Sequence, residues 1–438
     1  MPQTLVAREA YRRYLLSSIL TRGKLAATTG LLMTDPRDLL AEPLKLQCGA
    51  VLPHRLAKSA LSEQLGDRRN APSAELAQLY RTWARGGAGL LVTGNVMVDP
   101  AALGEPRNVA VPAEPDPAAY RSWAQSVDGT DAQLWVQLNH PGRQSPRYLS
   151  RQPVAPSAVP FGDRGVRTAF AAPRALTGDE IEAVVARFAL SARTFVDAGF
   201  AGIQIHGAHG YLISQFLSPL VNRRDDEWGR DRSRFLLEVV RAVRGAVGDR
   251  VPVSVKLNSA DFQRGGFAED ESLQVVRALG EAGIDLLEIS GGTYERAVMM
   301  GSGRASTQRR EAYFLDYAAK ARQISDVALM VTGGFATTAG MAEALESGAL
   351  DVIGIGRPFT VDPALPGRLL AGEDVRAERR CPHTGIRLAD SLLEIQWHTQ
   401  QMHRVAAGKP VDLKRGAWRA LAQAGLSDPL NAFRRVRA

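Results

Sequence analysis

Eight repeats of a strand followed by a helix constrain the fold of this 438-residue chain more than any other feature. Between Leu44 and Leu370, short runs rich in Val, Ile and Leu end in a small or polar residue, and segments of helical periodicity lie between the runs. Continuous apolar strands that alternate with helices are typical of a parallel sheet covered on both faces. The predicted strands are residues 55–61, 89–96, 133–138, 201–208, 251–259, 284–292, 327–335 and 350–357.

The number of these units predicts an α/β fold of the (β/α)₈ TIM-barrel type. The predicted helices lie near residues 73–85, 117–128, 178–197, 231–247, 269–280, 311–324 and 337–347. Thr177 and Glu180 have the spacing of a capping box at the start of one of them. An open doubly wound sheet is the alternative, but no GxGxxG follows the first strand and no GxxxxGK[ST] occurs.

Segments outside the repeat add to the barrel. Residues 44–52 predict a hairpin that turns at Cys48 and Gly49 and closes the N-terminal end of the barrel. We expect three parts, namely an N-terminal extension over 1–42, the barrel over 43–370 and a basic, helical C-terminal extension over 371–438. The connections 140–176 and 293–310 are long, and long loops in a compact domain are usually functional or disordered. We expect both connections to form walls of the barrel mouth.

Composition excludes several classes of protein. The two cysteines are far apart, which argues against a disulfide scaffold, a CxxC zinc site or a four-cysteine iron–sulfur cluster and fits a reducing cytoplasm. No stretch reaches the roughly 18 apolar residues of a membrane span. The net charge is +8, yet no DNA-reading motif accompanies it, so we expect no nucleic-acid partner.

Polar residues and glycines follow the predicted strands where barrel active sites form, at their C-terminal ends. Gly333 and Gly334 leave backbone N–H groups uncovered before a predicted helix, and Gly356 and Arg357 add further donors, which together favour a phosphate site. The alternative is that these glycines only permit tight turns.

The side chains of Lys256 and Gln137 are expected to point into the barrel. A lysine there needs a partner or a ligand, because an unpaired buried ammonium is costly. It could stabilise negative charge on a cofactor, or it could pair with Glu288 on the next strand. Gln137 suits the edge of a heteroaromatic ring, since it carries a donor and an acceptor, but it could also fill a polar layer of the barrel.

His206, His209 and Tyr211 lie within six positions of one another at the end of the fourth predicted strand. A metal site is disfavoured because the histidines are three residues apart with Gly207 and Ala208 between them, unlike HExxH, and no third ligand is evident. Two N–H donors that converge on one oxygen are the better interpretation. A structural histidine pair is the plain alternative. Tyr211 carries an O–H that can donate a proton at neutral pH.

The stretch "HGAHGYLISQFLSPLVNRRDDEWG" resembles the signature of the Old Yellow Enzyme family of FMN-dependent NAD(P)H oxidoreductases. The blocks "WVQLNHPGRQ", "VKLNSADFQRGGF", "EISGGTYE", "VTGGF" and "GIGRP" also look like family blocks, in family order. The resemblance implies a barrel over residues 43–370 with FMN bound non-covalently at its mouth, NAD(P)H as hydride donor and a small enone-type substrate. It leaves open whether the chain forms a homo-oligomer.

The resemblance also assigns roles to residues. His206 and His209 would bind the substrate carbonyl oxygen, and Tyr211 would be the proton donor. The residues that would contact FMN are Ser59, Ala60, Ser62, Gly94, Gln137, Lys256, Gly333, Gly334, Gly356 and Arg357. Of these, Ala60 stands where many relatives have proline and Lys256 where many have arginine, which keeps the charge but loses the bidentate geometry.

The function that follows is an FMN-dependent ene-reductase. Flavin N5 would deliver hydride to the activated C=C bond of an α,β-unsaturated carbonyl compound and Tyr211 would protonate it, with ping-pong kinetics because both substrates share one site. Two alternatives stay open at this point. One is a metal-dependent barrel hydrolase that uses His206 and His209, and the other is a non-catalytic paralogue that binds flavin.

Overall fold

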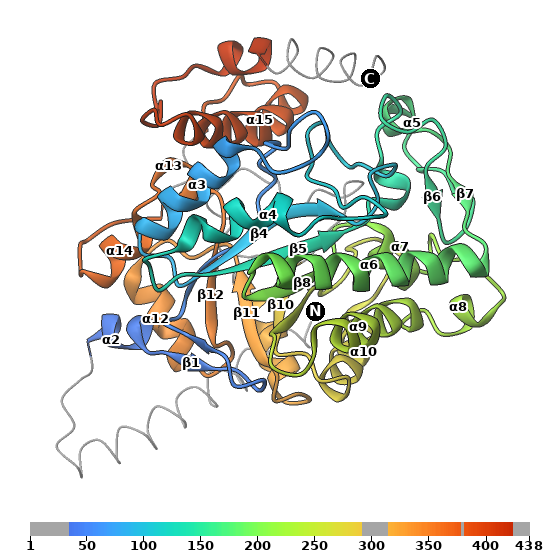
Figure 1. Ribbon diagram of the computed structural model, residues 1–438, viewed down its shortest axis with the longest axis horizontal. Helices are drawn as coiled ribbons and strands as arrows, with labels where there is room; N and C mark the ends of the chain where they lie inside the picture. The colour runs from blue at the N-terminus through green and yellow to red at the C-terminus, as the bar shows by residue number, and fades with distance from the viewer. Residues whose placement is uncertain (1–34, 291–313, 378–380, 424–438) are drawn as a thin grey trace, which may run out of the picture.

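Eight parallel strands form a closed barrel in the computed structural model, which describes residues 35–290, 314–377 and 381–423 (Figure 1). The strand order around the barrel is β10-β11-β12-β3-β4-β5-β8-β9. The strands are β3 (Leu56–Lys58), β4 (Leu90–Met97), β5 (Gln133–Asn139), β8 (Gly202–Gly207), β9 (Val253–Asn258), β10 (Leu286–Ser290), β11 (Ala328–Thr332) and β12 (Val352–Ile355). Each overlaps a predicted strand, so the predicted TIM barrel is confirmed.

Helices surround the barrel and follow the strands in the predicted order. They are α3 (Ala74–Arg85), α4 (Ala118–Ala124), η1 (Gln125–Val127), α6 (Gly178–Ala198), α7 (Leu212–Leu217), α8 (Glu227–Arg230), α9 (Arg234–Val247), α10 (Glu269–Glu281), α12 (Thr338–Glu346), α13 (Pro358–Val361) and α14 (Leu365–Leu370). The chain is also helical over 314–322. The capping box at Thr177 and Glu180 is present and begins α6.

The predicted hairpin is formed by β1 (Leu44–Lys45) and β2 (Val51–Leu52), with Leu44 paired to Leu52. Leu46 and Leu52 pack with barrel residues such as Trp135 and Met330 in a buried apolar cluster. The amide of Cys48 donates to the Asp285 carboxylate at 2.8 Å. Apolar side chains therefore fill the N-terminal end of the barrel and leave its polar groups to the other end.

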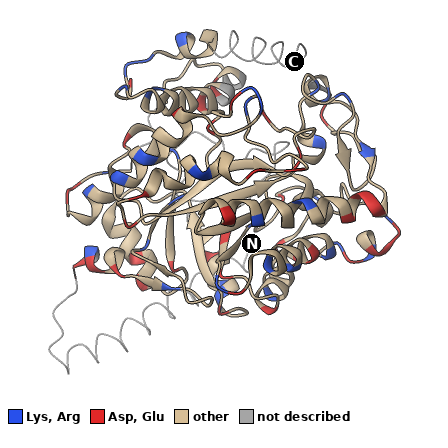
Figure 2. Ribbon diagram, viewed as in Figure 1, with Lys and Arg blue, Asp and Glu red and all other residues tan. Residues whose placement is uncertain are grey.

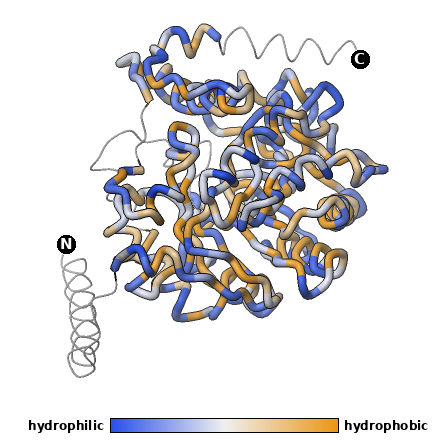
Figure 3. The backbone as a smooth tube through the Cα atoms, turned by 60° about the vertical axis from the view of Figure 1, so that its left-hand side comes forward, coloured by the Kyte–Doolittle hydropathy of each residue, from blue (hydrophilic) through white to orange (hydrophobic). Residues whose placement is uncertain are grey.

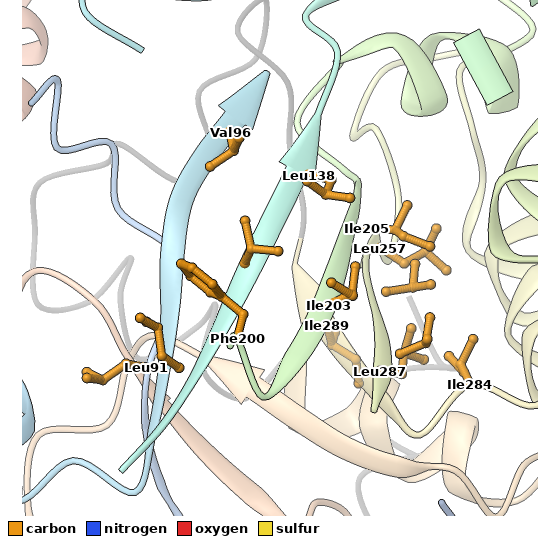
Figure 4. Packing of buried hydrophobic residues seen from close by; sticks show 14 of the residues in the cluster. Leu91, Val96, Leu138, Phe200, Ile203, Ile205, Leu257, Ile284, Leu287 and Ile289 are labelled. Carbon is orange, nitrogen blue, oxygen red and sulfur yellow. The ribbon is translucent and has the colours of Figure 1, made fainter. Parts of the chain in front are cut away.

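The main core lies between the strands and the helices outside them. Figure 4 shows the outward-facing side chains of this layer, including Ile203, Ile205, Leu257, Leu287 and Ile289, all fully or almost fully buried. Burying such a side chain stabilises the fold by about 1.5–3 kcal/mol. In Figure 3, apolar and polar stretches alternate along the tube, as expected for helices with one buried face.

The connection after β5 builds a small structure of its own beside the barrel mouth (Figure 1). It contains the 3₁₀ turn η2 (Gly142–Gln144), the helix α5 (Arg164–Ala169) and the parallel pair of β6 (Val154–Ala155) with β7 (Arg174–Ala175). The other long connection, 293–310, lies outside the described residues.

Both extensions contribute described elements. The helix α2 (Pro36–Ala41) packs on α12 and buries Leu40 completely, while residues 1–34 lie outside the described part. The helix α15 (Arg387–Ala406) packs against α3 and α13 (Figure 1). Figure 2 shows Lys and Arg interspersed with Asp and Glu on the outer helices. None of the described helices combines the length and apolar composition needed to span a bilayer.

Candidate active site

The two histidines and the tyrosine form one cluster at the end of β8. His206 belongs to the strand, His209 follows it and Tyr211 is the N-cap residue of α7. The ring centroids of His206 and His209 are 5.1 Å apart, and those of His206 and Tyr211 are 4.9 Å apart. The end of the strand and the start of the helix hold the three rings together, because only five residues separate His206 from Leu212 across this turn.

The His206 ring is buried and has a defined tautomer. The amide of Ala208 donates to its Nδ1 at 3.2 Å, so the hydrogen of the neutral ring is on Nε2. Burial, together with the nearby His209 and Lys256, holds the pKa of His206 well below its usual value. His206 is therefore a neutral N–H donor at physiological pH.

His209 is held by contacts with the ends of β9 and β10. Its Nε2 lies 2.7 Å from the Ser290 hydroxyl at the end of β10, and its backbone amide donates to Asn258 at 3.2 Å. Its backbone has a φ of 61°, which is uncommon for a non-glycine residue and often marks a functional site. Burial, with a smaller effect of Lys256, lowers the pKa of His209 to about 3, so this ring is neutral as well.

The connection after β5 contacts this turn. Gln144 Nε2 donates to the carbonyl of His209 at 3.1 Å, and the amide of Leu212 donates to the carbonyl of His140 at 2.9 Å. The part of the connection next to β5 thus forms a wall of the site.

A buried polar layer crosses the barrel beneath the cluster. Gln137 donates to Gln204 at 2.7 Å, and Gln204 donates to Glu288 at 2.9 Å. Thr332 donates to the same carboxylate at 2.7 Å and lies 2.7 Å from the Ser59 hydroxyl. The strand register explains these contacts, since parallel neighbours place Gln137 beside Gln204.

Lys256 pairs with Glu288, one of the two roles considered for it. Its Nζ lies 2.8 Å from Oε1 of the carboxylate, and the two residues are register partners on β9 and β10. Both side chains are almost completely buried. Lys256 occupies the predicted level of the barrel, and Glu288 compensates its charge.

The loops after β11 and β12 suit a phosphate group. Gly333 and Gly334 have φ values of 97° and 96°, and a Cβ added at Gly333 would meet nothing within 4 Å. The amide of Gly333 donates to the carbonyl of Gly354 at 3.2 Å, so the expectation of an uncovered N–H group is wrong for this glycine. Within the described part of the chain, the amides of Gly334 and Gly356 donate to no other group. Arg357 follows directly and forms an ion pair with Glu394 of α15. Open amides beside a guanidinium fit the phosphate of FMN.

Two acidic side chains hold polar groups in and beside the loop after β3. The hydroxyl of Ser62 donates to the carboxylate of Glu105. The amide of Gly94 is bound by Glu63 at 2.8 Å, so this glycine is fixed from the loop after β3. Ala60 is half-buried next to the fully buried Ser59.

A metal centre has no support from the geometry. Among the residues that the structure describes, no group of three His, Cys, Asp or Glu side chains is arranged to hold a metal ion.

Sequence reasoning missed several residues of the site. Gln204 and Thr332 complete the polar layer, and their signal was a polar side chain at alternate positions of an otherwise apolar barrel strand. Glu394 had no comparable signal, because it lies on a helix outside the barrel repeat.

Comparisons with known proteins agree with this geometry. The chain matches the family model described as NADH:flavin oxidoreductase / NADH oxidase family over residues 39–374. It is 35% identical over 396 residues to the NADH-dependent flavin oxidoreductase iliE of Hypocrea jecorina, covering 84% of this chain and 97% of that protein.

Solved structures show the same fold. The old yellow enzyme homologue from Zymomonas mobilis superimposes with a TM-score of 0.64 and 25% identity, over 77% of this chain and 93% of that one. A 2-naphthoyl-CoA reductase has a TM-score of 0.72 at 23% identity, over 78% of this chain and 54% of that one. Since the family match spans the whole barrel, the chain belongs to the Old Yellow Enzyme family of NADH:flavin oxidoreductases, enzymes that use FMN and a reduced nicotinamide.

Proposed function

We propose that this FMN-dependent oxidoreductase reduces the activated C=C bond of α,β-unsaturated carbonyl compounds. The observation that carries the proposal is the cluster of two neutral histidines and one tyrosine at the end of β8. The oxygen of a carbonyl substrate needs hydrogen-bond donors that keep the same protonation state at physiological pH. When Cβ of the substrate accepts a hydride, the neighbouring Cα must accept a proton. The cluster contains groups of both kinds.

The histidines would bind the substrate oxygen. His206 has its hydrogen on Nε2, because Nδ1 accepts from the Ala208 amide. The Ser290 hydroxyl can donate to Nε2 of His209, which leaves Nδ1 of that ring as its N–H donor. Two neutral donors on one oxygen stabilise the negative charge that develops there during reduction, and so make Cβ more electrophilic.

Tyr211 would supply the proton. Bound FMN supplies the chemistry of hydride transfer, taking a hydride from NAD(P)H and giving it to Cβ. Tyr211 then donates its phenolic proton to Cα, so that one hydride and one proton saturate the bond. The phenolate regains a proton from solvent before the next turnover. Because nicotinamide and enone share one site, the kinetics would be ping-pong.

Two other interpretations are weaker. A metal-dependent hydrolase would need a third ligand near His206 and His209, and family membership points to redox chemistry instead. A non-catalytic flavin-binding paralogue would not need two buried neutral histidines beside a tyrosine.

The test is to measure the two half-reactions separately in the wild type and in Tyr211→Phe. We expect NAD(P)H to bleach the flavin band of both proteins at rates within about threefold, and cyclohexenone to recolour the variant at least about 100-fold more slowly, the usual contribution of a positioned acid. A wild type that NAD(P)H bleaches but no enone recolours would refute the proposal. Equal loss of both half-reactions in the variant would argue against a proton-donor role.

A further inference from the structure

The C-terminal helix α15 contacts the chain after β3 and after β12, two segments that carry half of the proposed cofactor residues. After β3, the carbonyl of Glu63 lies 2.7 Å from His403 Nε2. After β12, the hydroxyl of Thr360 lies 2.6 Å from His398 Nδ1. The third contact is the ion pair of Arg357 with Glu394. These contacts come from three successive parts of one helix, so α15 fixes both loops at once.

A cavity separates α15 from the barrel mouth. Its volume is about 130 Å³. Leu61, Ser62 and Arg357 line it from the barrel, and Glu394 and Met402 line it from α15. The cavity thus connects the loop expected to contact the flavin ring with the arginine expected to bind the phosphate. The C-terminal extension therefore borders the proposed cofactor site directly.

We propose that Glu394 is a positioning residue for the cofactor, and that α15 is thereby a part of the cofactor site. Glu394 fixes the guanidinium of Arg357 beside the open amides of Gly334 and Gly356, where the phosphate of FMN binds. This inference rests on the proposed phosphate site. It adds to that site a carboxylate from a helix outside the barrel repeat.

The physical reason is the conformational freedom of arginine. A guanidinium has five N–H donors, so an arginine that pairs with a carboxylate can also donate to a phosphate. The side chains of Arg357 and Glu394 are 23% and 17% exposed, so the ion pair is only partly screened by water. Without Glu394, Arg357 would have to lose its rotamer freedom when FMN binds. That cost corresponds to about a threefold to tenfold loss of affinity.

The experiment compares FMN with riboflavin, which has the same ring and no phosphate. Each flavin is titrated by fluorescence quenching into full-length, flavin-free protein. The variants are Glu394→Gln, Arg357→Gln and the double variant. Glu373→Gln is the matched control, because it makes the same chemical change in an ion pair with the exposed Arg368. Thermal unfolding verifies that each variant is folded.

For Glu394→Gln we expect FMN affinity to fall about threefold to tenfold and riboflavin affinity to stay within about twofold. The double variant should bind FMN no more weakly than Arg357→Gln alone, because Glu394 acts only through Arg357. Unchanged or tighter FMN binding by Glu394→Gln would overturn the inference, the latter by showing that Glu394 competes with the phosphate. Equal loss of both flavins would show a structural role and overturn it too. If Arg357→Gln binds FMN normally, the proposed phosphate site itself is wrong.

Discussion

The ammonium of Lys256 and the carboxylate of Glu288 lie 2.8 Å apart inside the barrel, on neighbouring strands and almost completely shielded from water. Glu288 also accepts hydrogen bonds from Gln204 and Thr332. The charge of Lys256 is therefore compensated before any cofactor binds. A lysine at this level can act on the flavin without the penalty of an isolated buried charge.

Removal of one partner should be costly. Lys256→Met leaves Glu288 buried without its counter-charge, and we expect a loss of about 3–5 kcal/mol in the free energy of unfolding. The double variant Lys256→Met with Glu288→Gln should recover most of that loss, since no charge then remains buried. Urea denaturation of the flavin-free proteins measures both values.

The control for this pair is Lys320→Met, whose partner Glu269 lies at the surface. Exposed ion pairs contribute about 0–1 kcal/mol, so this variant should unfold close to the wild type. If Lys256→Met were as stable as Lys320→Met, the buried pair would not stabilise the barrel.

The glycine at the start of the loop after β11 should matter for phosphate binding beyond its effect on stability. Gly333→Ala forces a side chain into a backbone with φ of 97°, next to the open amide of Gly334. We expect a stability loss of about 1–2 kcal/mol from the backbone strain. FMN affinity should fall at least about tenfold, because a displaced loop loses charge-assisted hydrogen bonds from its amides to the phosphate. Riboflavin affinity should be much less affected, because riboflavin has no phosphate.

Gly348→Ala provides the comparison. Gly348 has φ of 69°, its added Cβ would also meet nothing within 4 Å, and it follows α12 on the side away from the mouth. It should lose similar stability and keep its FMN affinity. Similar FMN binding by the two variants would remove the support for a phosphate site at Gly333.

Acid should destabilise the fold through its buried histidines. Burial lowers the pKa of His209 to about 3 and that of His140 to about 4. In the unfolded chain both titrate near 6.5, so below that pH the unfolded state binds protons that the native state excludes. The free energy of unfolding should therefore fall as the pH drops from about 6.5 to 4, by up to about 1.4 kcal/mol per pH unit for each such histidine.

The measurement is urea denaturation at a series of pH values. In His140→Gln the slope should be shallower by about one proton's contribution. A slope that His140→Gln leaves unchanged would contradict the assignment of a neutral, buried His140.

Local sequence signals determined the architecture and the centre of the site. Apolar runs that alternate with helical periods predicted all eight strands, because a strand buried on both faces must be apolar wherever it lies in the barrel. Thr177 predicted the start of α6 by its own hydrogen bonds. His206, His209 and Tyr211 came together because one tight turn carries all three.

Tertiary structure alone decided which groups meet across the barrel and over its mouth. Lys256 could have faced a cofactor or paired with Glu288, and the register of β9 with β10 places it beside Glu288. The Ser62 hydroxyl donates a hydrogen bond to Glu105, a contact that no local sequence pattern indicated. Arg357 contacts Glu394 because α15 packs against α3 and α13, and contacts between segments far apart in the chain depend on how whole elements pack. The sequence thus determined the barrel and its reactive turn, whereas packing determined the charge balance around the cofactor.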